Sequence, residues 1–144
     1  MDLDMIKGAS GAIPRNDLAR MDAHAERFYE EIRRRNSDIE IIARNTGHSV
    51  EAISSIKEHV FFDEHALGDD VPERFSPDYD MAVSWQRLIS GDDIREMDLV
   101  LLRHEQMELG LMRRGIPYFE AHKQAEAVHN YTKYVKQLNE EAEL

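Results

Sequence analysis

The sequence predicts an all-α fold: a single compact domain of five to six helices with an internal helix-turn-helix-like element. Apolar residues recur at intervals of three and four, capping residues precede these stretches, glycines follow them, and strand-like alternation is absent. The 144 residues suit one domain, and a hydrophobic content of 42% argues against disorder. We expect an irregular arm over residues 1–15 and one helical domain over residues 16–144.

Three helices are expected in the first half of the chain. Asn16 or Asp17 can cap a first helix that runs to about residue 35, with an apolar stripe formed by Leu18, Met21, Ala25, Phe28, Tyr29 and Ile32. A short second helix over about residues 38–45 should end at Gly47 in a left-handed conformation. Ser49 then caps a third helix, whose inward residues are Ile53, Ile56 and Val60.

Three more helices are expected after a polar loop. The fourth begins at Ser76-Pro77, where a side-chain cap precedes proline at the first helical position, and ends at residue 91. The fifth begins at Asp93, with Glu96 at the spacing of a capping box, and runs to residue 114. Pro117 begins the last helix, which carries inward Ala121, Ala125, Val128, Val135 and Leu138.

Composition excludes several kinds of site and partner. The chain has no cysteine, so any metal must be bound by His, Asp, Glu or water. A net charge of -11 repels phosphate backbones, which disfavours nucleic acid as a partner without excluding it. The first residues lack the regions of a signal peptide, and the longest apolar run, Leu99–Leu102, is too short to span a membrane. We therefore expect no membrane association and a cytoplasmic location.

The predicted fifth helix carries the residues that most resemble a chemical site. At about 100° per residue, Asp98, His104, Glu105 and Glu108 fall within its apolar arc and therefore point toward the core or a cleft. A buried carboxylate needs a counter-charge, a hydrogen-bond donor or a metal. His104 and Glu108 lie four residues apart on one face, and His122 on the next helix can reach them across a short turn.

These residues predict a metal-assisted hydrolytic site. His104, Glu108 and His122 would form a set of two histidines and one carboxylate with an open position for water, and zinc is the first divalent metal to consider. Glu105 would be the base that activates this water. The pattern His-Glu-x-x-Glu differs from the His-Glu-x-x-His of metalloprotease helices, so nuclease and peptidase chemistry both stay open.

A structural role explains the same cluster. Its members could form a buried network of hydrogen bonds and ion pairs that fixes helix packing, with partners among Lys57, Arg74, Arg87 and Tyr118. The domain would then be a non-catalytic interaction module.

His59 and His65 suggest a different catalytic arrangement. With Lys57, Arg74 and Asp78 nearby in the sequence, the two histidines would suit a metal-independent acid–base site of the nuclease type.

Residues 42–56 match the spacing of a helix-turn-helix element. Ala43 allows close helix approach, Gly47 makes the turn, and Ile53 and Ile56 seal the interface. The would-be reading helix over residues 49–61 carries two glutamates and one lysine, whereas groove-reading helices bring Arg, Lys, Asn or Gln. We expect the element to serve as scaffold rather than as a DNA reader.

Several segments together resemble a known family. They include Ser10-Gly11-Ala12, Ala23-His24-Ala25-Glu26, Ile56-Lys57-x-His59-Val60-Phe61, Arg74-Phe75-x-Pro77-Asp78, Ala82-x-x-Trp85-x-Arg87-Leu88, Asp98-Leu99-x-Leu101-Leu102-x-His104-Glu105 and Ala121-His122-x-x-Ala125. From about residue 10 to 135 the chain resembles the C-terminal domain of phage minor head (head-morphogenesis) proteins, which also occurs in secreted bacterial polymorphic toxins and as free-standing prophage-type proteins. The resemblance implies a phage structural protein or a toxin immunity protein as partner. It also implies a virion-associated or delivered location as the alternative to the cytoplasm, and it implies no particular reaction.

Overall fold

The helices follow the apolar periodicity of the chain. The computed structural model describes residues 13–143, which form α2 (Leu18–Arg34), α3 (Asp38–Thr46), α4 (Val50–Lys57), the π-helical turn η1 (Glu58–Phe62), α5 (Tyr79–Ser90), α6 (Glu96–Arg113), α7 (Tyr118–Val128) and α8 (Thr132–Glu143). Apart from an isolated bridge between His65 and Glu73, no β-structure occurs among these residues. The all-α prediction is confirmed, with seven α-helices where five to six were expected. Most of the expected N-terminal arm lies outside the described residues.

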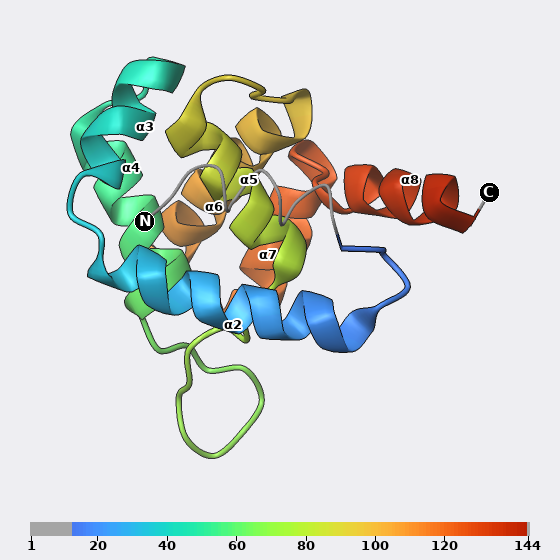
Figure 1. Ribbon diagram of the computed structural model, residues 1–144. Coiled ribbons are helices and arrows are strands. Elements are labelled where there is room, and N and C mark those ends of the chain that lie inside the picture. The colour runs from blue at the N-terminus through green and yellow to red at the C-terminus, as the bar shows by residue number, and fades with distance from the viewer. Residues whose placement is uncertain (1–12, 144) are drawn as a thin grey trace.

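The extra helix comes from a break in the predicted last helix. α7 ends at Val128, and Asn130 accepts a hydrogen bond from the Lys133 N–H at 3.0 Å, so α8 begins as a separate helix. The Tyr131 hydroxyl lies 2.9 Å from the Ser84 hydroxyl on α5. The break therefore folds the start of α8 back over the domain, while the rest of α8 projects away from it (Figure 1).

Two helix starts differ from the prediction. Asp78, rather than Ser76, caps α5, because its Oδ1 accepts the Met81 N–H at 2.9 Å. At α6 the cap residue is Arg95, whose N–H donates to Asp98 at 2.9 Å. The reciprocal cap thus uses Asp98, three residues into the helix, and not the predicted pair of Asp93 and Glu96.

The core lies where α2, α4, η1 and α5 meet around α6. Its largest buried side chains include Phe28, Tyr29, Phe61, Trp85 and Leu102. α6 packs against α4, α5 and α7, so residues on several of its faces are buried. A helix enclosed in this way can direct polar side chains into the interior, which is how the candidate site arises. No helix among residues 13–143 is both long enough and apolar enough to cross a membrane.

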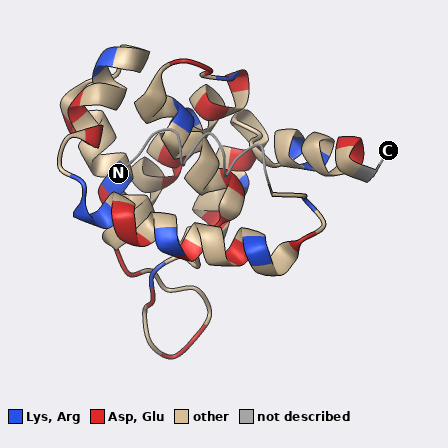
Figure 2. Cartoon of the chain, viewed as in Figure 1, with Lys and Arg blue, Asp and Glu red and all other residues tan. Residues whose placement is uncertain are grey.

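The helix-turn-helix-like element is formed by α3, Gly47 and α4. Gly47 has φ +80°, the left-handed conformation predicted for it. Asn45 donates through Nδ2 to the Leu88 carbonyl at 2.8 Å, which ties the element to the end of α5. The only lysine of α4, Lys57, is 4% exposed and pairs with Asp38 at 2.8 Å. Basic residues are interspersed with acidic ones over the described helices rather than gathered on α4 (Figure 2).

Candidate functional site

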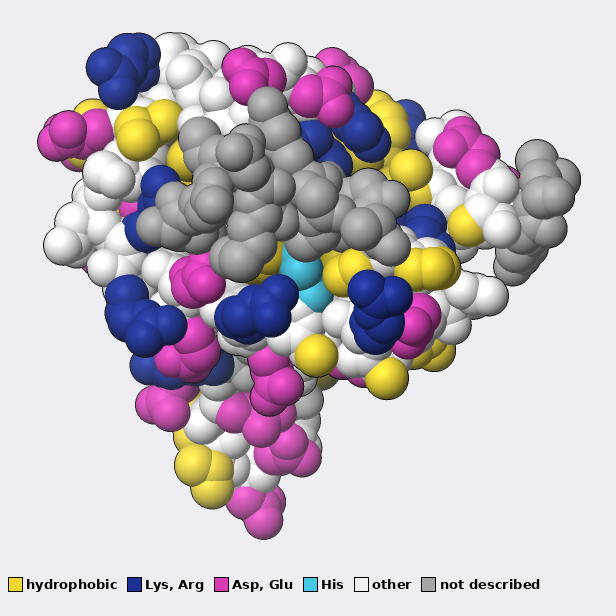
Figure 3. Space-filling model, in the orientation of Figure 1, with side chains coloured by type: hydrophobic (Ala, Val, Ile, Leu, Met, Phe, Trp, Pro, Cys, Tyr) yellow, Lys and Arg dark blue, Asp and Glu magenta, His cyan; other side chains and the backbone are white. Residues whose placement is uncertain are grey.

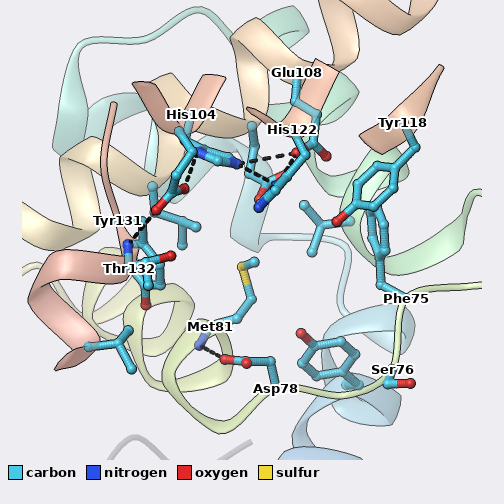
Figure 4. A pocket seen from close by; sticks show the side chains of 16 residues that line it. Phe75, Ser76, Asp78, Met81, His104, Glu108, Tyr118, His122, Tyr131 and Thr132 are labelled. Atoms are coloured by element: carbon cyan, nitrogen blue, oxygen red, sulfur yellow. Dashed lines mark hydrogen bonds and ion pairs between the residues drawn. The ribbon is translucent and has the colours of Figure 1, made fainter. Parts of the chain in front are cut away.

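Three of the predicted site residues converge at the junction of α6 and α7. His104 Nε2 lies 3.2 Å from Glu108 Oε2 and 3.3 Å from His122 Nδ1, and His122 Nδ1 lies 2.9 Å from Glu108 Oε2. His104 and Glu108 are 3% and 1% exposed, whereas the His122 side chain is 42% exposed and faces a cavity (Figure 4). The turn between the two helices brings His122 against the i, i+4 pair, as the spacing predicts.

This triangle of atoms has the dimensions of a metal-ligand set. Ligands at about 2.0–2.1 Å from a tetrahedral zinc ion stand about 3.3–3.4 Å apart, close to two of the three distances above, whereas the 2.9 Å between His122 Nδ1 and Glu108 Oε2 is shorter. With a small adjustment of this pair, these His and Glu side chains can hold a metal ion. Two neighbouring groups also bring potential ligand atoms within 4.8 Å of one another: His104, His122 and Glu126, and His59, Glu105 and Glu108.

The Nδ1 atom of His104, which faces away from Glu108 and His122, has two acceptors close to it. His104 Nδ1 lies 3.1 Å from the His129 carbonyl oxygen and 3.2 Å from Glu126 Oε2. Both partners are acceptors, so Nδ1 carries the proton, and in the neutral ring the lone pair of Nε2 points at Glu108 and His122. A lone pair facing a carboxylate oxygen repels it unless a proton or a cation lies between them.

His59 and Glu105 extend the cluster toward η1. His59 Nε2 lies 2.8 Å from Glu108 Oε1 and 3.5 Å from Glu105 Oε2. Glu105 is 6% exposed, and its Oε2 has no hydrogen-bond partner among the described residues. Burial raises the pKa of Glu105 well above its usual value, and the neighbouring charge of Glu108 raises it further. The predicted base is therefore a buried carboxylate with one uncommitted oxygen.

The charge state of Glu108 follows from its histidines. Burial by itself would raise the pKa of Glu108, but hydrogen bonds with His104, His122 and His59 outweigh burial and hold this pKa far below its usual value. The hydrogen bond to Glu108 in turn raises the pKa of His122. The pair of Glu108 and His122 therefore favours an ionised carboxylate beside a protonated imidazole.

His65 lies one layer away from the cluster. Its Nε2 donates to the His59 carbonyl oxygen at 2.8 Å, and its ring stacks on Phe75 with centroids 4.3 Å apart. Arg74 donates to the Phe62 carbonyl at 3.3 Å, and Lys57 pairs with Asp38. The structure brings the rings of His59 and His65 to 4.8 Å between centroids, whereas Lys57 and Arg74 make other contacts, so it assembles only part of the predicted metal-independent acid–base site. His65 also holds the backbone that carries His59.

The cationic partners expected for a purely structural network are bound elsewhere. Arg87 forms two hydrogen bonds with Asp98, at 2.7 Å and 2.8 Å, so Asp98 belongs to an ion pair outside the cluster. Within residues 13–143, no Lys or Arg pairs with Glu105 or Glu108. Tyr118 does lie beside the cluster, with its ring 5.6 Å from that of His122. Among residues 13–143, the side chains that pair with these two buried glutamates are histidines.

A cavity of about 360 Å³ opens onto the cluster. His104, Glu105, Glu108 and His122 line one end, and Tyr118 lines a wall (Figure 4). Burial raises the pKa of Tyr118 to about 12, so its hydroxyl stays protonated and can donate a hydrogen bond. Water and a small substrate group can therefore reach the candidate ligands.

Sequence reasoning missed two contributors to this site, Glu126 and the His129 carbonyl, and it assigned Asp78 to the alternative arrangement with His59 and His65. Glu126 lies four residues after His122 on α7, a spacing that places both on one helix face and that could have been noticed. The His129 carbonyl becomes available because α7 ends there, and Asp78 enters the cavity wall through its place at the start of α5. The last two depend on the helix ends, which the periodicity of apolar residues does not locate.

Comparison of the chain with family models, with curated proteins and with solved structures finds no match.

Proposed function

We propose that this domain is a metal-dependent hydrolase whose cation is held by His104, Glu108 and His122, with zinc as the metal. The observation that carries the proposal is the triangle of three potential ligand atoms 2.9–3.3 Å apart. Glu126 and the His129 carbonyl contact the Nδ1 atom of His104 and so orient its ring. Such outer partners fix the ring orientation of metal-binding histidines.

The chemistry follows from the neighbours of this triangle. A divalent cation would supply Lewis acidity, which lowers the pKa of an adjacent water. The Glu105 carboxylate takes a proton from this water as the water oxygen bonds to the electrophilic centre of the substrate. The same proton passes to the leaving group as its bond breaks, so Glu105 returns to its starting state. The Tyr118 hydroxyl, from a residue that lines the same cavity, would donate to the oxygen on which negative charge develops.

Metal analysis tests the proposal. The full chain, purified without a polyhistidine tag and dialysed against trace zinc, should retain about one zinc per chain, as measured by mass spectrometry of the metal. His104→Ala and His122→Ala should lose it. His129→Ala is the matched control, because only the backbone carbonyl of His129 contacts the site and alanine keeps it. A wild-type chain without bound metal would remove the basis of the proposal.

A second candidate is a non-catalytic interaction module in which the cluster is structural. It is favoured by Glu108, both of whose oxygens already meet histidine nitrogens at 2.8–3.2 Å without a metal. In this case zinc does not bind, and His104→Ala lowers the melting temperature without changing any activity.

The biological setting of both candidates is proposed from the resemblance to phage minor head proteins and polymorphic toxins. A toxin setting fits a hydrolase that has zinc as cofactor and is inhibited by an immunity protein. A phage or prophage setting fits the interaction module, with a phage structural protein as partner. Co-purification with candidate partners encoded beside the gene would separate the two settings.

A further inference from the structure

The cavity beside the His104–Glu108–His122 triangle is lined by four acidic side chains, and its basic groups among the described residues are the two histidines. Asp78, Glu105, Glu108 and Glu126 line it, and none of its described lining residues is Lys or Arg. A divalent cation on the triangle would offset two of the four negative charges when all four carboxylates are ionised. The cavity would stay negative with the metal bound, which disfavours an anionic substrate group.

Glu105 gives independent evidence that a ligand completes this cavity. Glu105 is 6% exposed and lies at the cavity wall, and its Oε2, which stands 3.5 Å from His59 Nε2, has no hydrogen-bond partner among the described residues. A buried carboxylate oxygen without a partner is costly, so a hydrogen-bond donor or a cation entering the cavity would relieve that cost.

Asp78 lies at the other end of the cavity from the triangle, with Met81 between them (Figure 4). Its Oδ1 accepts the Met81 N–H at 2.9 Å, which fixes the carboxylate at the start of α5. Among the described residues, no Lys or Arg forms an ion pair with Asp78. This carboxylate is therefore held in place and is free to pair with a cation supplied by a ligand.

The approach to the cavity is acidic as well. The loop between η1 and α5 projects from the domain and displays acidic side chains on the face shown in Figure 3. Up to Arg74 it contains five acidic residues, Asp63, Glu64, Asp69, Asp70 and Glu73, against one arginine, Arg74 itself, and its later residues Phe75 and Ser76 form part of the cavity wall. A polyanion such as DNA or RNA would meet negative charge both outside and inside the site.

We infer that the substrate is a peptide with a Lys or Arg side chain next to the scissile amide, and not a phosphodiester. This inference rests on the hydrolytic function proposed above. The cationic side chain extends toward Asp78 while the amide lies against the triangle and Glu105. Water adds to the amide carbon, the carbon–nitrogen bond breaks, and the leaving nitrogen receives the proton that Glu105 took from the water.

Binding of three small hydroxamates tests the recognition of charge without requiring turnover. The zinc-loaded full chain is titrated calorimetrically with the Nα-acetyl hydroxamates of lysine, norleucine and glutamate. The hydroxamate group chelates zinc in every case, so differences in affinity report the side chain. Lysine hydroxamate should bind at least about tenfold more tightly than the uncharged norleucine derivative, and glutamate hydroxamate should bind most weakly.

One variant isolates the role of Asp78. Asp78→Asn keeps a side chain that caps α5 and removes the charge, so the lysine-to-norleucine affinity ratio should fall close to one. Asp17→Asn makes the same change at the cap of α2, outside the cavity, and should leave the ratio unchanged. Equal binding of the lysine and norleucine derivatives to wild type, or an unchanged ratio in Asp78→Asn, would overturn the inference.

Turnover assays separate the inference from the proposed function. The zinc-loaded chain is given quenched peptides that contain Lys or Arg and, separately, single-stranded DNA and RNA. Cleavage of the peptides beside the basic residue supports the inference. Cleavage of nucleic acid without cleavage of peptide overturns it and leaves a hydrolase. A chain that binds no zinc in the prior metal analysis defeats the proposed function and the inference together.

Discussion

Helix α6 buries carboxylates in two places, and their partners differ. Asp98 is 0% exposed and accepts two hydrogen bonds from the Arg87 guanidinium and one from the Arg95 N–H. Glu108, three turns along the same helix, meets three histidines, and Glu105 has an oxygen with no hydrogen-bond partner among the described residues. An arginine is permanently protonated, whereas a histidine can release its proton and bind a metal instead. Burial of a carboxylate therefore says little about function until its partner is known.

The largest effect is expected for Glu105→Gln, which tests the functional end of α6. Loss of the base should lower the hydrolytic rate by about 10²–10⁴-fold. The free energy of unfolding should stay the same or rise, because burial disfavours the ionised form of Glu105 and glutamine cannot ionise. Steady-state hydrolysis and urea denaturation measure the two quantities. Glu96→Gln, an exposed substitution on the same helix, is the control. If the Glu105→Gln enzyme unfolds more readily and keeps full activity, the role of Glu105 is structural.

Asp98→Ala tests the structural end of α6. Removing one partner of a buried ion pair leaves the Arg87 guanidinium without its carboxylate, so the free energy of unfolding should fall by about 3–5 kcal/mol. Zinc content and zinc affinity should not change, because Asp98 lies outside the cluster. Denaturation with and without zinc measures both effects. Asp93→Ala is the control: it breaks an exposed pair with Arg95, and the free energy of unfolding should fall by no more than about 1 kcal/mol. Loss of zinc in Asp98→Ala would mean that the two ends of α6 are not independent.

Glu126→Ala should weaken zinc binding without removing it. Glu126 contacts His104 on the nitrogen that faces away from the triangle, and loss of such a partner lowers metal affinity by about 10- to 100-fold. Competition with a fluorescent chelator measures the change. Glu120→Ala, an exposed substitution on the same helix, should bind zinc like the wild type, so equal losses in both variants would argue against a positioning role for Glu126.

The smallest effect is a change of sign in the pH dependence of stability. In the metal-free protein, Glu108 raises the pKa of His122 above its ordinary 6.5. A raised histidine pKa contributes stability fully below pH 6.5, and this contribution is lost as pH rises through the pKa of the folded state. Saturating zinc should reverse the trend over the same interval, because the metal competes with protons for His122.

Thermal unfolding at several pH values, with and without zinc, shows the two trends. His122→Gln should flatten both. Parallel trends with and without zinc would mean that His122 is not a ligand.

The helices and the ligand triangle were predictable because they depend on spacing along the chain. Residues four apart on a helix share a face, so His104 and Glu108 lie together. The short turn after Gly115 then brings His122 close to this pair. The choice of partners was not predictable, because it depends on tertiary packing. Lys57 and Arg87 were both candidate partners of the cluster, and the fold gives one to Asp38 and the other to Asp98. Helix ends were also missed where a side chain decides them, as Asp78 does for α5.

Because of the π-helical turn at Glu58–Phe62, the cluster depends on the number of residues in this segment rather than on their types. Within this turn His59 contacts Glu108 on α6, while Phe61 packs against Tyr29 on α2 and Trp85 on α5. A π turn is equivalent to inserting one residue into an α-helix, a defect that recurs at functional sites. Deleting one residue here would restore a regular helix and withdraw one of these two contacts. The segment should therefore accept many substitutions but no change in length.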